Sequence, residues 1–193
     1  MTAAVLPAEF IPVDLPLAGG RRVTLRAVHP QDKDAIQAAI KRLSAESRYA
    51  RFMTALRELP PQMLERAVNP DQARELQLVA VCGEGAQQKI VGGARYVGSP
   101  GSGDCEFAVT VADEWQGLGL ARQLLQSLMQ AARARGLERM EGYILASNSR
   151  MLGLAKRIGF AEVESSEGPT VRMVRRDLER LPDRGHAARN LTR

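Results

Sequence analysis

Hydrophobic residues in the first half of the chain alternate in some stretches and recur every three or four positions in others. Residues 22–28 alternate as a half-buried strand does, whereas residues 34–43 have the spacing of an amphipathic helix. Ser44 is placed to cap a second helix, and Pro60-Pro61 opens a third. Two apolar runs flank the turn-forming sequence GEGAQQ and predict a hairpin of residues 76–82 and 90–97.

The second half continues with a strand-like run at 105–111, which leads into a glycine-rich turn. Past Gly119 the period becomes helical, and a wide apolar stripe ends at Gly136. The remaining pattern predicts a strand at 140–145, a helix from Asn148 to a C-terminal glycine cap at Gly159, and closing strands at 160–164 and 170–176. This order predicts an α/β domain in which helices cover both faces of a mixed sheet.

The chain divides into an arm, a domain and a tail. Residues 1–20 contain three prolines and end in Gly19-Gly20, which is typical of an extended N-terminal arm. Residues 21–178 carry the periodic elements, and a chain of 193 residues suits one domain with a sizeable core. Residues 179–193 contain little apolar material, so we expect a flexible basic tail.

The formal net charge of +5 comes mostly from arginines. They are interspersed with acids except in the last stretch of the chain, so nucleic acid is not the expected partner. The N-terminus lacks the basic start of a signal peptide, and the composition is that of a soluble protein, so we expect a cytoplasmic location and no membrane partner. No cluster of His, Cys, Asp and Glu has metal-ligand spacing, and we expect no metal.

The sharpest local feature is the sequence Gln-Gly-Leu-Gly-Leu-Ala at 116–121, between a strand and an amphipathic helix. A helix start offers free backbone N–H groups and the positive end of the helix dipole, and glycine lets a phosphate approach the backbone. This arrangement suits a pyrophosphate. The alternative is a turn used only for tight packing. The glycine spacing does not match a dinucleotide-binding fingerprint, and no Gly-Lys-Ser/Thr follows for a nucleoside triphosphate.

Glu106 is the strongest candidate for acid–base chemistry. It lies within an apolar strand between Cys105 and Phe107, where burial without a partner is costly, so its carboxylate should face a cleft or water. A solvent-facing position on a half-exposed strand is the alternative. Asn148 has two interpretations as well, as a helix N-cap and as a contact to a bound ligand, and both can hold.

Four segments together resemble the GNAT acetyltransferase superfamily across residues 21–177: VTLRAV, VCGEGAQQKIVGGARYV, CEFAVTVADEWQGLGLARQLL and ILASNSRMLGLAKRIGF. More narrowly, RLSAESRYARF, CEFAVTV and NSRMLGLAKRIGF resemble the acetyltransferase domain of Pat-type bacterial protein lysine acetyltransferases. The resemblance implies a GNAT-like fold, with a mostly antiparallel sheet of about six to seven strands. Pat-type proteins often carry a further regulatory domain, for which 193 residues leave no room.

The resemblance also implies the reaction and its site. Acetyl-CoA is the expected acyl donor, and the acceptor is an amine, with a protein lysine favoured. Glu106 is the expected general base for direct attack by the amine, without an acyl-enzyme. Asn148 contacts the cofactor's arm, and the backbones of Val109 and Val111 pair with the pantetheine. The pyrophosphate site comprises Gln116, Gly117, Leu118, Gly119, Leu120, Ala121 and Arg122.

One departure concerns the general acid, because Ala155 stands where many members of the superfamily have a tyrosine. The thiolate, whose conjugate thiol has a pKa near 8.5, can leave unprotonated or take a proton from water, Tyr143 or Ser149. Arg48, Tyr49 and Arg51 form either a lining of the acceptor side or a solvated helix face.

Other functions remain open at this point. The acceptor can be a small amine or polyamine instead of a protein lysine. The domain can be a non-catalytic acyl-CoA-binding module, in which Glu106 is dispensable. The basic tail can bind nucleic acid, which a steep salt dependence would reveal.

Overall fold

The computed structural model describes residues 10–164 and 167–178. The first nine residues of the expected arm and the whole of the expected tail, 179–193, lie outside the described residues. The strands are β1 (Val13–Pro16), β2 (Arg22–Ala27), β3 (Glu75–Cys82), β4 (Lys89–Gly98), β5 (Asp104–Val111), β6 (Arg139–Leu145), β7 (Ala161–Val163) and β8 (Val171–Asp177). The α-helices are α1 (Lys33–Arg42), α2 (Ala45–Phe52), α3 (Pro61–Val68), α4 (Leu120–Ala134) and α5 (Ser149–Arg157).

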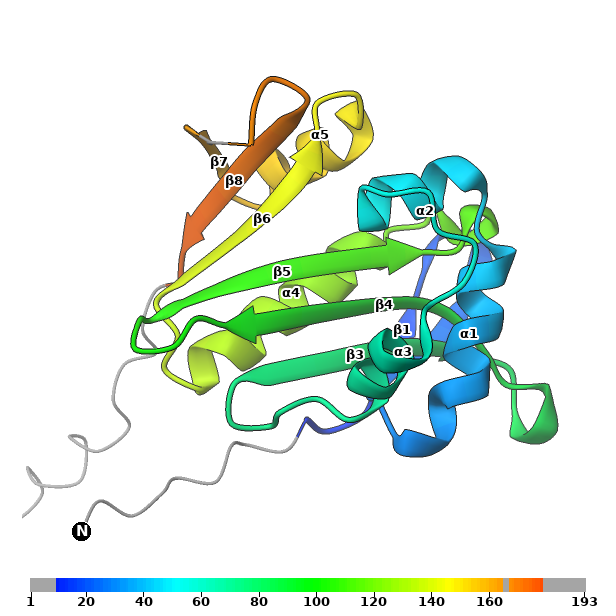
Figure 1. The fold of residues 1–193 in the computed structure, drawn as a ribbon. Coiled ribbons are helices and arrows are strands. Elements are labelled where there is room, and N and C mark those ends of the chain that lie inside the picture. Colours follow the sequence, from blue (N-terminus) through cyan, green and yellow to red (C-terminus); the bar gives the residue numbers. More distant parts are fainter. Residues whose placement is uncertain (1–9, 165–166, 179–193) are drawn as a thin grey trace, which may run out of the picture.

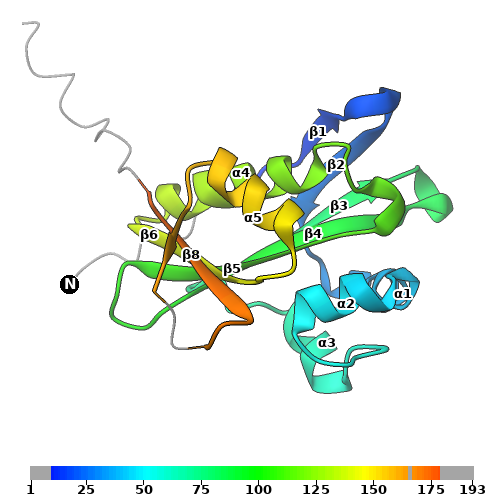
Figure 2. The same cartoon turned by 90° about the horizontal axis from the view of Figure 1, so that it is seen from above.

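The strands form one sheet in the order β1-β2-β3-β4-β5-β6-β8-β7. Every neighbouring pair is antiparallel except β5 and β6, which are parallel. Helices α1, α2 and α3 cover one face, and α4 and α5 cover the other (Figures 1 and 2). The α/β architecture with a mostly antiparallel, doubly covered sheet is therefore confirmed.

The expected number of strands was too low, because the sheet of the described residues has eight strands rather than about six to seven. The additional strand is β1, which lies in the N-terminal segment and pairs with β2 from Val13 opposite Leu25 to Pro16 opposite Arg22. Three of its four residues are exposed, so it lacks the alternation of apolar and polar residues that marks a half-buried strand.

Each helical layer contributes its own apolar cluster. On one face of the sheet, the stripe of α4 predicted from the sequence is fully buried, with Leu124, Leu125 and Leu128 inaccessible to solvent. On the other face, Ile36 and Ile40 of α1 pack against β3 and β4.

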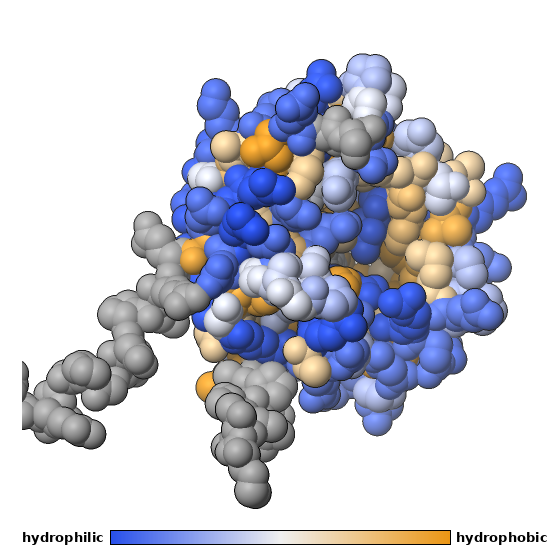
Figure 3. Space-filling view, turned by 60° about the vertical axis from the view of Figure 1, so that its left-hand side comes forward, coloured by the Kyte–Doolittle hydropathy of each residue, from blue (hydrophilic) through white to orange (hydrophobic). Residues whose placement is uncertain are grey.

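Hydrophilic residues cover most of the surface seen in Figure 3, and hydrophobic ones gather around a hollow on its right-hand side. Among the described helices, none has both the length and the apolar character needed to cross a membrane.

Strands β5 and β6 stay together only at their beginning. Their ladder comprises Asp104 with Arg139, Cys105 with Met140, and Glu106 with Glu141, after which the strands diverge (Figure 1). Gly142 follows immediately on β6, and a Cβ at this position would come within 2.5 Å of the Phe107 ring. The Phe107 ring, which packs edge-to-face against the Phe160 ring, therefore lies where the two strands separate. Beyond Glu106 the two backbones are no longer paired, and we call the widening space between them the opening.

Candidate active site

The backbone of β5 directs polar groups toward this opening. The Ala112 N–H donates to the backbone oxygen of Val91 at 2.9 Å, and the Ser99 N–H donates to the backbone oxygen of Asp104 at 2.9 Å. At both ends of β5, the backbone groups of even-numbered residues therefore form hydrogen bonds toward β4. Backbone polar groups alternate between the two edges of a strand. The N–H and C=O groups of Val109 and Val111 consequently point into the opening.

The glycine-rich turn ends at the start of α4, beside the opening. Gly117 and Gly119 have φ angles of 75° and 90°, a left-handed conformation that side chains rarely adopt. Gly119 is the N-cap of α4 and provides no side-chain hydrogen bond. Nothing lies within 4 Å of a Cβ built on either glycine. Arg122, in the first turn, is exposed. The geometry thus presents an accessible, positively polarised helix start.

The N-terminal segment holds the turn on one side. The Ala18 N–H donates to the Leu118 oxygen at 3.3 Å, and the Arg21 guanidinium donates to the Glu114 oxygen at 2.7 Å. Arg21 also stacks on the Trp115 ring, 4.7 Å from its centroid. The conformation of the turn is therefore fixed by residues outside it.

Helix α2 holds the turn on the other side through Asp113. The Asp113 carboxylate accepts hydrogen bonds from the Ser44 N–H and from the hydroxyls of Ser44 and Ser47, at 2.6–2.9 Å. Burial alone would raise the Asp113 pKa, but these hydrogen bonds lower it below its usual value. The Gln116 amide donates to the Ser47 hydroxyl at 3.2 Å and to the Val111 oxygen at 3.3 Å. The Gln116 side chain therefore braces the turn.

Asn148 is the N-cap of α5, because its side-chain oxygen accepts a hydrogen bond from the Met151 N–H at 3.1 Å. This confirms the capping interpretation. Ala155 on the same helix is fully buried in the core. Because alanine has no side-chain proton to donate, the general acid must be another group. Ser149 is exposed at the first position of α5.

Glu106 lies on the sheet face covered by α1, α2 and α3, at the point where the opening begins. Its side chain is among the exposed ones of β5, yet the surrounding elements remove enough water to raise the pKa of its carboxyl group. The charge of Glu141 raises this pKa further, and the charges of Arg51 and Arg95 oppose the increase. A raised pKa favours a carboxylate that can accept a proton near neutral pH.

Two neighbours on β6 complete this part of the site. Glu141 forms an ion pair with Arg175 of β8 at 3.1 Å. Tyr143 is two residues further along β6 and therefore shares the face of Glu141. Partial burial and the charges of Glu141 and Glu106 raise the Tyr143 pKa, so its phenol is neutral and a hydrogen-bond donor at pH 7.

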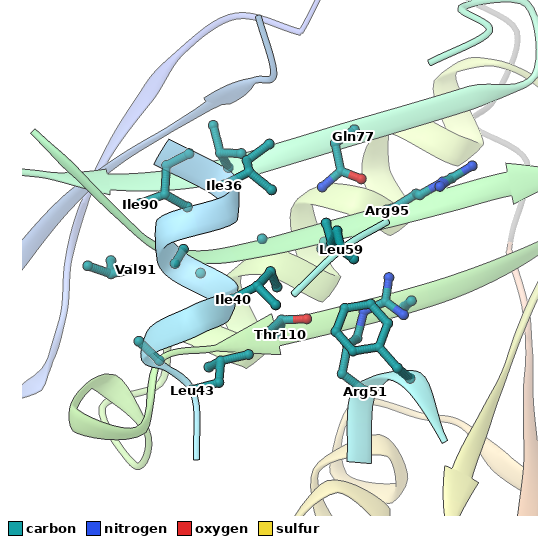
Figure 4. A pocket seen from close by; sticks show the side chains of 18 residues that line it. Ile36, Ile40, Leu43, Arg51, Leu59, Gln77, Ile90, Val91, Arg95 and Thr110 are labelled. Carbon is teal, nitrogen blue, oxygen red and sulfur yellow. The ribbon is translucent and has the colours of Figure 1, made fainter. Parts of the chain in front are cut away.

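A cavity of about 90 Å³ lies on the same face, between α1, α2 and strands β3 to β5 (Figure 4). Its walls are mostly apolar, including Ile36, Ile40 and Leu59, and its polar groups come from Arg51, Gln77, Arg95 and Thr110. Ala108 of β5 also lines it, two residues beyond Glu106 on the same strand face. The cavity thus begins beside the candidate base.

Three comparisons place this geometry among known proteins. A model of the GNAT acetyltransferase domain matches residues 22–161. An acetyltransferase of Pseudomonas aeruginosa is 34% identical over 144 residues, which are 75% of this chain and 77% of that protein. The chain belongs to the GNAT acetyltransferase family. It is accordingly an N-acetyltransferase, as its sequence motifs predict.

Similarity to Pat proteins within the GNAT family is also confirmed. The acetyltransferase Pat of Mycolicibacterium smegmatis is 29% identical over 164 residues, which cover 84% of this chain and 48% of Pat. The chain therefore spans about half the length of that relative. The crystal structure of the GNAT domain of S. lividans PAT superposes with a TM-score of 0.79 and 25% identity, covering 86% of this chain and 97% of that domain.

The GNAT fold brings some of the predicted site residues together at the opening and leaves others outside the site. Glu106, Val109 and Val111 line one strand next to the opening, and residues 116–122 form the turn at its side. Of the group on α2, only Arg51 lines the cavity. Tyr49 is half exposed, and the Arg48 guanidinium donates to the Leu43 oxygen.

Sequence patterns alone did not lead us to two charged residues of this GNAT domain that lie near Glu106, namely Arg95 and Glu141. Each is a charge within an apolar strand, which is the same pattern that identified Glu106. Applied to every strand, that criterion would have found both. Within the described residues, no three His, Cys, Asp or Glu side chains are grouped as a metal site requires.

Proposed function

We propose that this protein transfers an acetyl group from acetyl-CoA to an amine, with Glu106 as the general base and a protein lysine as the acceptor. The observation that carries the proposal is the position of Glu106. It lies at the start of the opening between β5 and β6, next to the cavity on one side and three residues from Val109 on the other. A base in this position can reach an amine that approaches a thioester held in the opening.

The donor would bind along β5 and the glycine-rich turn. The outward N–H and C=O groups of Val109 and the N–H group of Val111 suit pairing with the amides of the pantetheine, while the Val111 C=O already accepts a hydrogen bond from Gln116. The backbone N–H groups of residues 116–122 and the positive end of α4 suit the pyrophosphate. Asn148 can contact the pantetheine arm while it caps α5, because capping uses only its side-chain oxygen.

Glu106 would remove the proton that keeps the acceptor amine from acting as a nucleophile. A free lysine has a pKa of about 10.4, so only about one molecule in a few thousand is a neutral nucleophile at pH 7. Glu106, directly or through a water, takes a proton from the ammonium. The neutral amine nitrogen then attacks the thioester carbonyl and forms the C–N bond, the C–S bond breaks as the thiolate leaves, and the nitrogen gives up its second proton to water. The Val109 N–H would stabilise the oxyanion, and the neutral Tyr143 phenol is a candidate proton donor.

The preference for a protein lysine rests on the resemblance to Pat-type protein lysine acetyltransferases, supported by the similarity to two Pat proteins. The cavity lies on the sheet face that carries Glu106, and α2 borders it. Small amines, including polyamines, are the alternative acceptors with which a protein lysine is compared.

The experiment compares the wild type with Glu106→Gln and Glu141→Gln. Thiol release from acetyl-CoA is measured with lysine peptides, acetyl-CoA synthetase and polyamines, and acetyl-CoA affinity is measured by calorimetry. We expect Glu106→Gln to lower kcat by about a hundredfold to ten-thousandfold at unchanged acetyl-CoA affinity, because a base is lost and the binding surface is not. Glu141→Gln is the matched carboxylate control and should retain most of kcat.

Two outcomes would overturn the proposal. If Glu106→Gln transfers acetyl groups at the wild-type rate, Glu106 is not the base. If the wild type binds acetyl-CoA but acetylates none of these acceptors, the domain is an acyl-CoA-binding module.

A further inference from the structure

Arg51 carries a guanidinium without an anionic partner in the described part of the chain. It lines the cavity from α2 (Figure 4), and among the described residues no carboxylate lies within ion-pair distance of it. Its contact is the Phe52 ring, 4.8 Å away. Burial, followed by the charge of Arg95, lowers the Arg51 pKa to about 10, and Glu106 opposes this only in part. A half-buried cation without an anion is a costly arrangement that a ligand can relieve.

Arg95 lies beside Arg51 and is only partly satisfied. One of its terminal nitrogens forms an ion pair with the buried Glu75 at 3.0 Å. Its Nε is buried and lacks a hydrogen-bond partner among the described residues. A guanidinium has five N–H donors in a fixed fork that matches a carboxylate. The guanidinium of Arg51 and the second terminal nitrogen of Arg95 therefore keep N–H donors without partners among the described residues.

The register places this pair of arginines close to the candidate base. Arg95 is opposite Ala108 in the β4–β5 ladder, and Glu106 is opposite Val97, so Arg95 and Glu106 are diagonal neighbours on one face. Diagonal neighbours are about 7–8 Å apart between Cα atoms. The charges of Arg51 and Arg95 both act to lower the Glu106 pKa, in agreement with this placement on one face.

The charge balance of the site indicates what the acceptor must bring. Counted over Arg51, Arg95, Glu75 and Glu106, the site has no net charge when no acceptor is bound, although Arg51 itself forms no ion pair within the described residues. An acceptor that is only an ammonium brings a positive charge to Glu106 and leaves the site with an excess of one. An acceptor that also carries a carboxylate restores the balance, with the ammonium at Glu106 and the carboxylate at Arg51.

We infer that the acceptor carries a carboxylate close to its reactive amine, and that Arg51, assisted by Arg95, binds this carboxylate. This inference rests on the proposed function and specifies its substrate class. Two sources supply the same chemistry. One is an acidic residue next to a target lysine in a peptide, and the other is the α-carboxylate of a free amino acid with an apolar side chain, which the cavity would accept.

The test measures binding to the CoA-saturated protein by calorimetry, with two matched pairs of ligands. The first pair is a lysine peptide with Asp next to the lysine and the same peptide with Asn there. The second pair is leucine and leucinamide. In one pair we expect the wild type to bind the carboxylate member at least about tenfold more tightly, as a charge-assisted hydrogen bond to a guanidinium provides. The pair that shows the preference identifies the source.

Substitutions assign the preference to Arg51. Arg51→Gln should reduce the ratio of the two affinities to about one, and Arg51→Lys, which keeps the charge, should restore part of it. Arg57→Gln is the matched control, because Arg57 is an exposed arginine away from the cavity lining. It should leave the ratio unchanged. Circular dichroism of each variant verifies that the fold is intact.

Failure of this inference and failure of the proposed function give different results. Glu106→Gln should lose acetyl transfer but keep the affinity ratio, because it removes the base and leaves Arg51 in place. If Glu106→Gln remains fully active, the proposed base is wrong and the carboxylate preference still stands. If the wild type shows no preference in either pair, or Arg51→Gln retains it, the inference is overturned.

Discussion

Glu106 and Glu141 are the last register partners of the parallel β5–β6 ladder, so two carboxylates stand side by side where the strands begin to diverge. Neighbouring like charges disfavour each other's ionised form. Arg175 forms an ion pair with Glu141 at 3.1 Å, whereas Glu106 has no ion pair among the described residues. The effect therefore falls on Glu106, whose pKa is raised first by burial and then by Glu141.

This relationship predicts the pH dependence of the enzyme. A general base works when deprotonated, so kcat/KM should rise as pH increases through the Glu106 pKa, which lies above its usual 4.5. Glu141→Gln removes a negative neighbour and lowers that pKa, so the acid limb should move to lower pH. Arg51→Gln removes a positive neighbour and should move it to higher pH. Rate profiles for the three proteins check this, and limbs that coincide would contradict it.

A second prediction concerns Gly119, the left-handed N-cap of α4. A side chain in this conformation costs about 1–2 kcal/mol, and its Cβ would project into open space where we place the pyrophosphate. Gly119→Ala should therefore lower stability modestly and weaken acetyl-CoA binding by at least about tenfold. Calorimetric titration with acetyl-CoA and thermal unfolding measure the two effects.

Gly136, just past the other end of α4, supplies the control. Its φ is 77°, and nothing lies within 4 Å of a Cβ there either, so the backbone strain is of the same kind. Gly136→Ala should lower stability like Gly119→Ala but leave acetyl-CoA affinity unchanged. Equal loss of affinity in both variants would show that the effect on binding is indirect.

Local patterns in the sequence were sufficient to predict most elements of the fold. The apolar stripe of α4 and the N-caps Ser44 and Asn148 are local features, because each depends on residues within a few positions of one another. Strand β1 was missed because its pairing with β2 determines its structure, and its own residues are mostly exposed. Alternation is informative only when one face of a strand is buried.

The candidate site was predictable in part for the same reason. Glu106 stands out in its strand, but its neighbours come from α2, β4 and β6, which are distant in the sequence. The role of Gln116 was predicted as part of the turn's backbone, whereas its side chain bonds to Ser47, 69 residues away. Contacts of this kind depend on how the elements pack, and no spacing in the sequence encodes them.

A third prediction concerns the pair of Arg26 on β2 and Asp32 before α1. Two parallel hydrogen bonds of 2.7 and 2.8 Å join them, and the His29 N–H donates to the same carboxylate at 2.7 Å. Asp32→Asn removes the charge and leaves Arg26 poorly paired, so it should lower the free energy of unfolding by about 1–3 kcal/mol at neutral pH. Glu58→Gln, in the exposed pair with Lys41, is the control and should change stability little.

The same pair predicts how the stability difference varies with pH. Burial would raise the Asp32 pKa, but the hydrogen bonds from Arg26 and His29 and the Arg26 charge lower it below the unfolded value of about 3.9. The stabilisation is therefore fully present above the unfolded pKa and is lost as pH falls through the folded pKa. Denaturant unfolding of wild type and Asp32→Asn should give a constant difference near neutral pH that shrinks in acid. A difference that grows in acid would mean that Asp32 is not held as a carboxylate by Arg26.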